Sequence, residues 1–281
     1  MDSNPATTWG IGNYSSMARR LMPVAEAAVA AAAIRPSDRV VDIATGTGNA
    51  AVLAASRGAR TTGVDFEPVM LSLAERRATE SALAIDWLLG EATSLPLPDG
   101  CADVVLSVFG VMYAADHAAA ARELARICAP GARLVLAAWM PGTLLPAMGR
   151  VVGDYLPTPP AGSGPPSRWG DPEAIDAILA SAGLHVTSAV SHRLHLDFTD
   201  AEAATALLVD SAGHVVAERD RLHAEHRWND LVADLRAFVD RHGAVDTDRF
   251  VLTSDYLLVT ASTDTVSPTS TEADATLQPG R

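Results

Sequence analysis

The chain of 281 residues contains no lysine, because all 21 of its basic residues are arginine. Schiff-base catalysis and a phosphate-binding loop of the Walker type both need a lysine, so the sequence excludes them. Acidic residues number 34, which gives a net charge of −13 at neutral pH. An acidic protein repels the phosphates of nucleic acids and anionic membranes, and we expect neither as a partner.

Cysteine and long hydrophobic segments are also scarce. The two cysteines, Cys101 and Cys128, lie in apolar segments, which argues against a disulfide framework and is typical of a reducing cytoplasm. The longest apolar run, residues 24–34, is rich in alanine, contains Glu26 and is too short to span a bilayer. The first residues lack the basic start and apolar core of a signal peptide. We therefore expect a cytoplasmic globular protein.

Strand and helix patterns alternate along the first half of the chain. The strands are nearly continuous apolar runs, which predicts a parallel sheet covered by helices on both faces. A later segment, 184–198, has the alternation of a strand, and a last strand is predicted at 249–262. The predicted strands of the first half are 39–44, 59–65, 85–90, 102–110 and 133–139.

Four regions lie outside this alternation. Residues 1–34 are predicted to form N-terminal helices, broken at Pro23, that could act as a lid. The segment 140–170 holds many proline and glycine residues and is predicted to be a loop or flap. Residues 200–242 are predicted to be a helical insertion before the last strand. The Ser/Thr-rich tail 263–281 is predicted to be disordered.

A glycine-rich turn, GTGNAA at 46–51, follows the first strand, and Asp65 lies 19 residues after Gly46 at the end of the second. Glycines let the backbone approach a ligand, the following helix offers free N–H groups, and the acid can accept bonds from ribose hydroxyls. This pattern matches the dinucleotide fingerprint, so one interpretation is a nicotinamide-dependent oxidoreductase. The residues around the turn favour a different cofactor.

Four stretches in order resemble the motifs of the class I S-adenosylmethionine (SAM)-dependent methyltransferases. They are DIATGTG at 42–48, GVDFEPVML at 63–71, GEATSLPLPDGCADVVLSVFGV at 90–111 and ELARICAPGARLVLAAW at 123–139. The nearest resemblance is to the ubiquinone/menaquinone C-methyltransferase group, closely over 35–140 and in architecture over 1–262. It implies a Rossmann-like α/β domain at 35–262, with a seven-stranded, mostly parallel sheet whose last strand is antiparallel.

The resemblance implies SAM as the cofactor and gives each matching position a role. Asp42 orders the turn, Asp65 takes the ribose diol, and Ser107 and Phe109 face the cofactor from the end of the fourth strand. The remaining positions are the backbone of Ala44, Thr45 and Gly46 at the methionyl part, Phe66 and Met70 beside the adenine, and Glu91 and Ala92 at the adenine edge. In this family Ala44 replaces a glycine, which costs little unless its φ is positive.

Methyl transfer from a sulfonium is an in-line displacement, so the enzyme mainly aligns the acceptor and excludes water. A base is needed only when the acceptor loses a proton. We expect Tyr14 and His117 to be the catalytic candidates, because N-terminal helices of the family close over SAM and His117 begins the helix after the fourth strand. Other candidates are His192, His195, Tyr113 and Tyr155. We expect no metal. His192 and His195 point to opposite faces of a strand, and His223 and His226, which could share a helix face, have a spacing that is usually solvated.

The acceptor is expected to be small and largely apolar, because the flap and the helical insertion offer mainly apolar and aromatic side chains. A phosphate-bearing acceptor is disfavoured, because arginines are not clustered there. The resemblance favours C-methylation of an electron-rich carbon in natural-product metabolism, with an isoprenoid alkene and ensuing cyclisation as one form. O- or N-methylation is an alternative. A nicotinamide oxidoreductase and a non-catalytic SAM-binding protein remain open, and the N-terminal helices could mediate a homo-oligomer.

Overall fold

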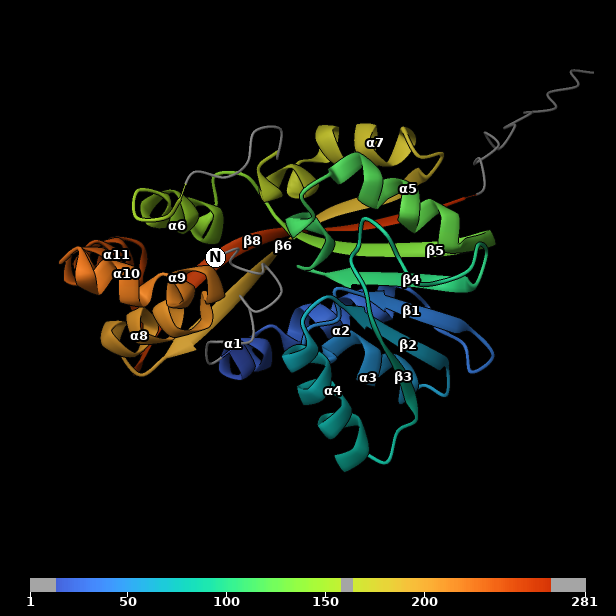
Figure 1. The fold of residues 1–281 in the computed structure, drawn as a ribbon, viewed down its shortest axis with the longest axis horizontal. Helices are drawn as coiled ribbons and strands as arrows, with labels where there is room; N and C mark the ends of the chain where they lie inside the picture. Colours follow the sequence, from blue (N-terminus) through green and yellow to red (C-terminus); the bar gives the residue numbers. More distant parts are fainter. Residues whose placement is uncertain (1–13, 158–163, 264–281) are drawn as a thin grey trace, which may run out of the picture.

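The computed structural model describes residues 14–157 and 164–263, and its centre is one mostly parallel sheet (Figure 1). The strand order is β3-β2-β1-β4-β5-β8-β6, and the short β7 pairs with β8. The strands are β1 (Arg39–Ile43), β2 (Arg60–Asp65), β3 (Ile85–Leu89), β4 (Ala102–Val108), β5 (Cys128–Trp139), β6 (His185–Phe198), β7 (Ala244–Asp246) and β8 (Arg249–Ser262). β8 runs antiparallel to both β5 and β6, which confirms the predicted Rossmann-like fold. The sequence did not predict β7.

Helices cover both faces of this sheet, as its apolar strands require. Figure 1 shows α5 and α7 over one face and α2, α3 and α4 over the other. Their bounds are α2 (Met22–Ala31), α3 (Asn49–Ala55), α4 (Pro68–Glu80), α5 (His117–Ile127) and α7 (Pro172–Ala180). The central strands β1, β4 and β5 are buried over most of their length, and Ile43, Leu106, Leu134 and Leu136 are among the largest buried side chains.

Local signals explain where these helices begin. The predicted break before Pro23 separates α1 (Tyr14–Arg20) from α2, and Pro23 lies in the first turn of α2. The carboxylate of Asp171 accepts the backbone N–H groups of Glu173 and Ala174, each at 3.0 Å, and so caps α7. Asp116 caps α5 in the same way by accepting from the N–H of Ala119.

The prediction of a loop at 140–170 was wrong for much of the segment. The structure contains α6 (Leu144–Gly153) and the 3-10 helix η4 (Pro166–Gly170). Pro146 falls in the first turn of α6, where its missing N–H has no partner to lose. Leu144 is buried in the main core, and Val152 is buried in a second, smaller core. Apolar packing therefore outweighs the helix-breaking composition of the segment.

Residues 200–242, which the sequence predicts to be helical, form four helices that pack with α6 around a small second core. They are α8 (Ala201–Ser211), α9 (Gly213–Ala217), α10 (Arg219–Ala224) and α11 (Trp228–His242). Val152 and Tyr155 share this core with Leu222, Leu231 and Leu235 of the insertion. The Tyr155 hydroxyl donates to the carboxylate of Asp234. The end of α6 is thus fixed to α10 and α11.

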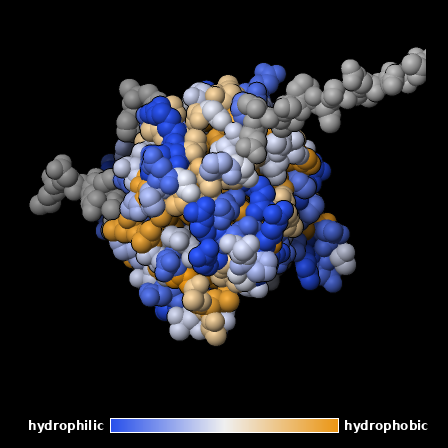
Figure 2. All heavy atoms as spheres, turned by 90° about the vertical axis from the view of Figure 1, so that its right-hand side faces the viewer, coloured by the Kyte–Doolittle hydropathy of each residue, from blue (hydrophilic) through white to orange (hydrophobic). Residues whose placement is uncertain are grey.

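The opposite end of the molecule, on the right of Figure 1, is where the parallel strands begin. Figure 2 shows this end as largely hydrophilic surface with smaller hydrophobic areas between. Arg39 and Asp103 pair there at 2.7 Å between the first residues of β1 and β4. Across the described residues, no helix has the length and apolar character needed to cross a membrane. The N-terminal residues 1–13 and all but Thr263 of the expected disordered tail lie outside the described residues.

Candidate active site

A cavity of about 730 Å³ lies where β1, β2, β4 and β5 end. Open α/β sheets bind ligands at these carboxyl ends, so the position agrees with the sequence-based expectation. The strand ends supply one wall, and α1, α4, α6 and the α8–α9 region supply the others (Figure 1). Of the expected site residues, the lining includes Tyr14, Ala44, Gly46, Asp65, Phe66, Met70 and Phe109.

Asp65 holds the glycine-rich turn and lines the cavity. Its carboxylate accepts the N–H of Gly46 at 2.7 Å through one oxygen and the N–H of Glu67 at 3.0 Å through the other. Each oxygen retains a second lone pair, so both can accept further bonds. Burial raises the pKa of Asp65, and the backbone bonds from Glu67 and Gly46 act against that rise.

Ala44 adopts the left-handed conformation, with φ of +52°. The sequence analysis expects alanine to replace glycine at little cost only where φ is not positive. That condition is not met, so Ala44 stores backbone strain. A β-carbon added to Gly110 would lie 2.5 Å from the β-carbon of Ala44 and 2.7 Å from its carbonyl oxygen. The turn after β1 and the turn after β4 are thus in close contact, and Gly110 allows that contact.

Asp42 lies beneath the turn and does not line the cavity. Its carboxylate accepts the hydroxyl of Thr45 at 2.6 Å and the backbone N–H of Ala51 at 3.0 Å. Burial raises the pKa of Asp42 to about 7, although these two hydrogen bonds act to lower it. This geometry agrees with the expected role of Asp42, which is to order the turn and the start of α3.

Aromatic rings cover the strand-end wall. Phe109 also has a positive φ, of +54°, and its ring stacks on Trp139 with centroids 3.6 Å apart. Tyr14 approaches the turn from α1, because its Cε1 atom lies 3.7 Å from the position of a β-carbon on Gly46. Burial is the main cause that raises the pKa of Tyr14, and the charges of Tyr113 and Asp65 add to it.

Several expected cofactor residues do not line the cavity. Ser107 is fully buried; its hydroxyl donates to the carbonyl of Ile43 at 2.7 Å and accepts the N–H of Val111 at 2.9 Å. It ties β4 to β1, so the expectation that its side chain faces the cofactor was wrong. The backbone N–H of Thr45 donates to the carbonyl of Val64 and is not available to a ligand. The structure also leaves Glu91 and Ala92 out of the lining.

His117 is buried at the start of α5 and is likewise absent from the cavity lining. Its ring meets the edge of Trp169 at a centroid distance of 5.7 Å. Burial lowers the pKa of His117, and the nearby charge of Arg168 lowers it further. This placement gives His117 no direct path to a ligand in the cavity, and its catalytic role stays a prediction.

The cavity also contains residues that sequence reasoning did not assign to the site. Trp139 ends β5, and the rule that places ligands at strand ends could have identified it. Gly110 follows β4 directly, and the same rule applies to it. Arg150 on α6 and His214 on α9 come from helices whose packing the sequence does not reveal. Burial lowers the pKa of His214, which favours a neutral imidazole.

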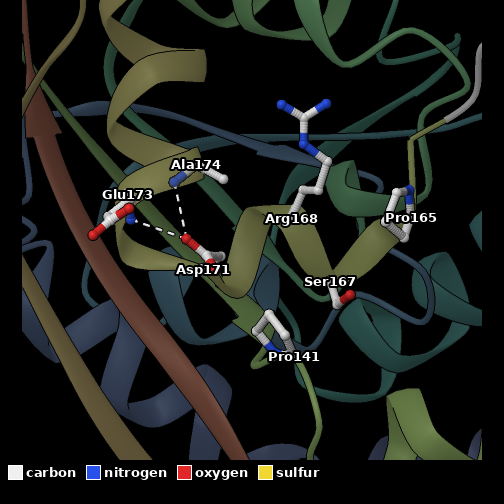
Figure 3. Close-up of a pocket in the computed structure, with 7 residues that line it drawn as sticks. All are labelled: Pro141, Pro165, Ser167, Arg168, Asp171, Glu173 and Ala174. Carbon is white, nitrogen blue, oxygen red and sulfur yellow. Dashed lines mark hydrogen bonds between the residues drawn. The ribbon is translucent and has the colours of Figure 1, made fainter.

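A second hollow of about 440 Å³ adjoins the large cavity, with which it shares Pro165 and Ser167 (Figure 3). The carboxylate of Asp171 lies on its wall, and Figure 3 shows that carboxylate bonded to the N–H groups of Glu173 and Ala174. Arg168 and Glu173 are the other charged residues of this lining, and in Figure 3 the Arg168 side chain extends away from the Asp171 carboxylate. The Asp171 carboxylate itself is engaged in capping α7. Among the described residues, no cluster of histidine, cysteine and carboxylate side chains could hold a metal ion.

Residues 41–136 match the family model of the methyltransferase domain. The chain is 36% identical over 180 residues to the protein Rv1403c of Mycobacterium tuberculosis, which is 62% of this chain and 66% of that protein. It is also 36% identical over 168 residues to the demethylmenaquinone methyltransferase of Thermus thermophilus, 53% of this chain and 74% of that enzyme. Geranyl diphosphate C-methyltransferase from Streptomyces coelicolor shares the fold, with a TM-score of 0.53, 17% identity and coverage of 86% and 76%.

The fold and the strand-end cavity define a Rossmann-like α/β domain with a ligand-sized cavity at the ends of its strands. With these matches, the chain belongs to the class I SAM-dependent methyltransferases, an enzyme family whose cofactor is SAM. The chain spans just under two thirds of the length of its Mycobacterium tuberculosis relative.

The residues at the strand ends fit SAM. Gly46 has φ of +55° and lines the cavity without a side chain, which leaves room for the methionyl part. The Asp65 carboxylate has lone pairs for two ribose hydroxyls, and the side chains of Phe66 and Met70 offer an apolar surface to the adenine. No cation from the described strand ends opposes the positive sulfonium, whereas the rings of Tyr14 and Phe109 can face it.

Proposed function

We propose that this protein transfers the methyl group of SAM to a small, largely apolar acceptor. The observation that carries the proposal is one continuous cavity, with Asp65 and the glycine-rich turn on one side and apolar helices on the other. Leu145 and Met148 of α6 and Leu208 of α8 line the helical side. SAM supplies an electrophilic methyl group on a sulfonium when it is bound.

The chain's own residues position the reactants and exclude water. The turn around Gly46 and the carboxylate of Asp65 hold the nucleoside and amino-acid parts. The stacked rings of Phe109 and Trp139 present an apolar surface beside the expected position of the methyl group. Because sulfonium is a good leaving group, alignment and a dry cavity supply most of the required acceleration.

C-methylation of an electron-rich carbon, in specialised metabolism, is the form of the reaction that we favour. The support is the similarity to an enzyme named for a quinone acceptor, demethylmenaquinone. The apolar helical wall is compatible with such a ring. The family membership argues against the nicotinamide alternative that GTGNAA alone left open.

A second candidate is O- or N-methylation, and the position of His214 favours it. An imidazole with a lowered pKa in the cavity wall can accept a proton from an acidic hydroxyl or amine. An isoprenoid alkene acceptor would not need such a base for the methyl transfer itself, so the position of His214 favours O- or N-methylation over that form.

The first test is isothermal titration of the protein with SAM, S-adenosylhomocysteine (SAH) and NADH, with Asp65→Ala as the variant. We expect SAM and SAH to bind, NADH not to bind, and the variant to lose SAH binding. Binding of NADH alone would overturn the proposal. Quinol, phenol and amine acceptors are then screened for methylated products by mass spectrometry. The position of the new methyl group distinguishes C-methylation from O- or N-methylation, and no product with any acceptor would indicate a protein that binds SAM without turnover.

A further inference from the structure

Helix α6 places one arginine between two glycines on the wall of the cavity. Gly149, Arg150 and Gly153 all line it, and Arg150 is the only charged residue of α6. In Figure 1, α6 lies across from α4 and β2, which carry the side of the cavity that holds Asp65. These three residues therefore belong to the acceptor half of the cavity.

Packing does not require glycine at either position. Apart from its chain neighbours and the backbone of α6 itself, a β-carbon added to Gly149 or to Gly153 would meet no described atom within 4 Å, and neither residue has a positive φ. Glycine is nevertheless less favourable than alanine in a helix. The two missing side chains widen the cavity on both sides of Arg150, which is the property that a bound molecule would use.

Arg150 makes no hydrogen bond or ion pair with any residue that the structure describes, and its side chain is exposed. Asp154, four residues further on, does not pair with it, and the carbonyl of Asp154 instead accepts from Arg227. Among the lining residues that the structure describes, Asp65 is the only other formally charged one, and it bonds the glycine-rich turn. A position near the end of α6 favours a cation through the helix dipole, but that effect does not require the cavity side of the helix.

We propose that the acceptor carries one carboxylate, which the guanidinium of Arg150 binds while the apolar body of the acceptor lies over Gly149 and Gly153. This proposal rests on the methyltransferase function proposed above and names the chemical class of its acceptor. A planar guanidinium matches a carboxylate through two parallel hydrogen bonds. A single arginine in the lining, in a chain without lysine, matches one negative charge rather than a diphosphate.

The test uses two probes that share a ring system and differ in charge, 2-naphthoate and 2-naphthamide. Each is titrated calorimetrically into the full chain saturated with SAH. We expect the wild type to bind 2-naphthoate at least tenfold more tightly than 2-naphthamide. Arg150→Gln should bring the two affinities within twofold without weakening the amide. Arg76→Gln, which changes an exposed arginine of α4 outside the cavity, should keep the full preference.

Gly149→Ala tests the steric part of the proposal. It should weaken both probes at least fivefold without lowering the melting temperature, because its β-carbon points into open space. The proposal is overturned if the wild type shows no preference for the carboxylate, binds neither probe, or keeps its preference in Arg150→Gln. A separate SAH titration of the wild type distinguishes failure of the proposed function from failure of the acceptor proposal. Absence of SAH binding refutes the methyltransferase function. Normal SAH binding without a preference for 2-naphthoate refutes only the proposal that the acceptor carries a carboxylate.

Discussion

The contact between Gly110 and Ala44 allows a quantitative prediction for Gly110→Ala. The new β-carbon would lie 2.5 Å from the Ala44 β-carbon, whereas carbon atoms pack favourably at about 3.5–4.0 Å. It would also lie 2.7 Å from the Ala44 carbonyl oxygen and 3.1 Å from the Ser107 hydroxyl. Ser107 is held by hydrogen bonds to Ile43 and Val111, so the surroundings cannot easily move. We expect a loss of roughly 3 kcal/mol, the upper part of the usual range for overpacking.

Urea unfolding followed by circular dichroism measures this loss, and the melting temperature should fall by roughly 6–12 °C. The matched control is the double-mutant cycle with Ala44→Gly. That change removes the 2.5 Å contact and the left-handed strain of Ala44, but leaves the 2.7 Å contact with the carbonyl. Gly110→Ala should therefore cost about 1 kcal/mol less in the Ala44→Gly background. Free energies that add within about 0.5 kcal/mol would refute the direct contact as the cause.

Three further predictions concern the cofactor site and α6. Asp65→Ala should weaken SAH binding by roughly 100-fold in calorimetry, because two charge-assisted hydrogen bonds are lost; an unchanged affinity would place the ribose elsewhere. Burial raises the pKa of Asp42 in the folded protein to about 7, above its usual value of 3.8. Protonated Asp42 therefore stabilises the folded state fully below pH 4, and this stabilisation is lost as the pH rises towards 7. Asp42→Asn should remove this loss, which approaches 1.4 kcal/mol per pH unit, and equal pH slopes in urea unfolding would contradict it. Gly149→Ala should raise the melting temperature by roughly 1–4 °C, and a decrease would show that packing needs the glycine.

The sheet could be predicted because its strands are buried on both faces and read as apolar runs. The resemblance to the methyltransferase motifs then pointed to Ala44, Asp65 and Phe109, and all three line the cavity at the strand ends. Ser107 shows where the resemblance is insufficient. It lies two residues before Phe109, and regular strand geometry would place both side chains on one face. The positive φ of Phe109 ends that regularity, so its ring faces the cavity while Ser107 stays between the strands.

The acceptor half of the cavity could not be predicted because it depends on contacts between distant segments. The composition of residues 140–170 indicated a loop, whereas burial of Leu144 and Val152 stabilises α6 there. His214 reaches the cavity only because α9 packs beside α8 and α6. His117 illustrates the reverse case: its position after β4 suggested a role at the ligand, but α5 buries it against Trp169.

The helical insertion enters and leaves the sheet at neighbouring points. Phe198 at the end of β6 pairs directly with Phe250 near the start of β8. The segment between them therefore begins and ends at one pair of facing residues in the sheet. Apart from the short β7, which lies inside the segment, its length and helices can change without altering the spacing of the other strands or the glycine-rich turn. An exchange of residues 199–248 for the corresponding segment of a relative would therefore replace the α8–α9 part of the cavity wall as a unit, leaving the residues at the ends of β1, β2 and β4 in place.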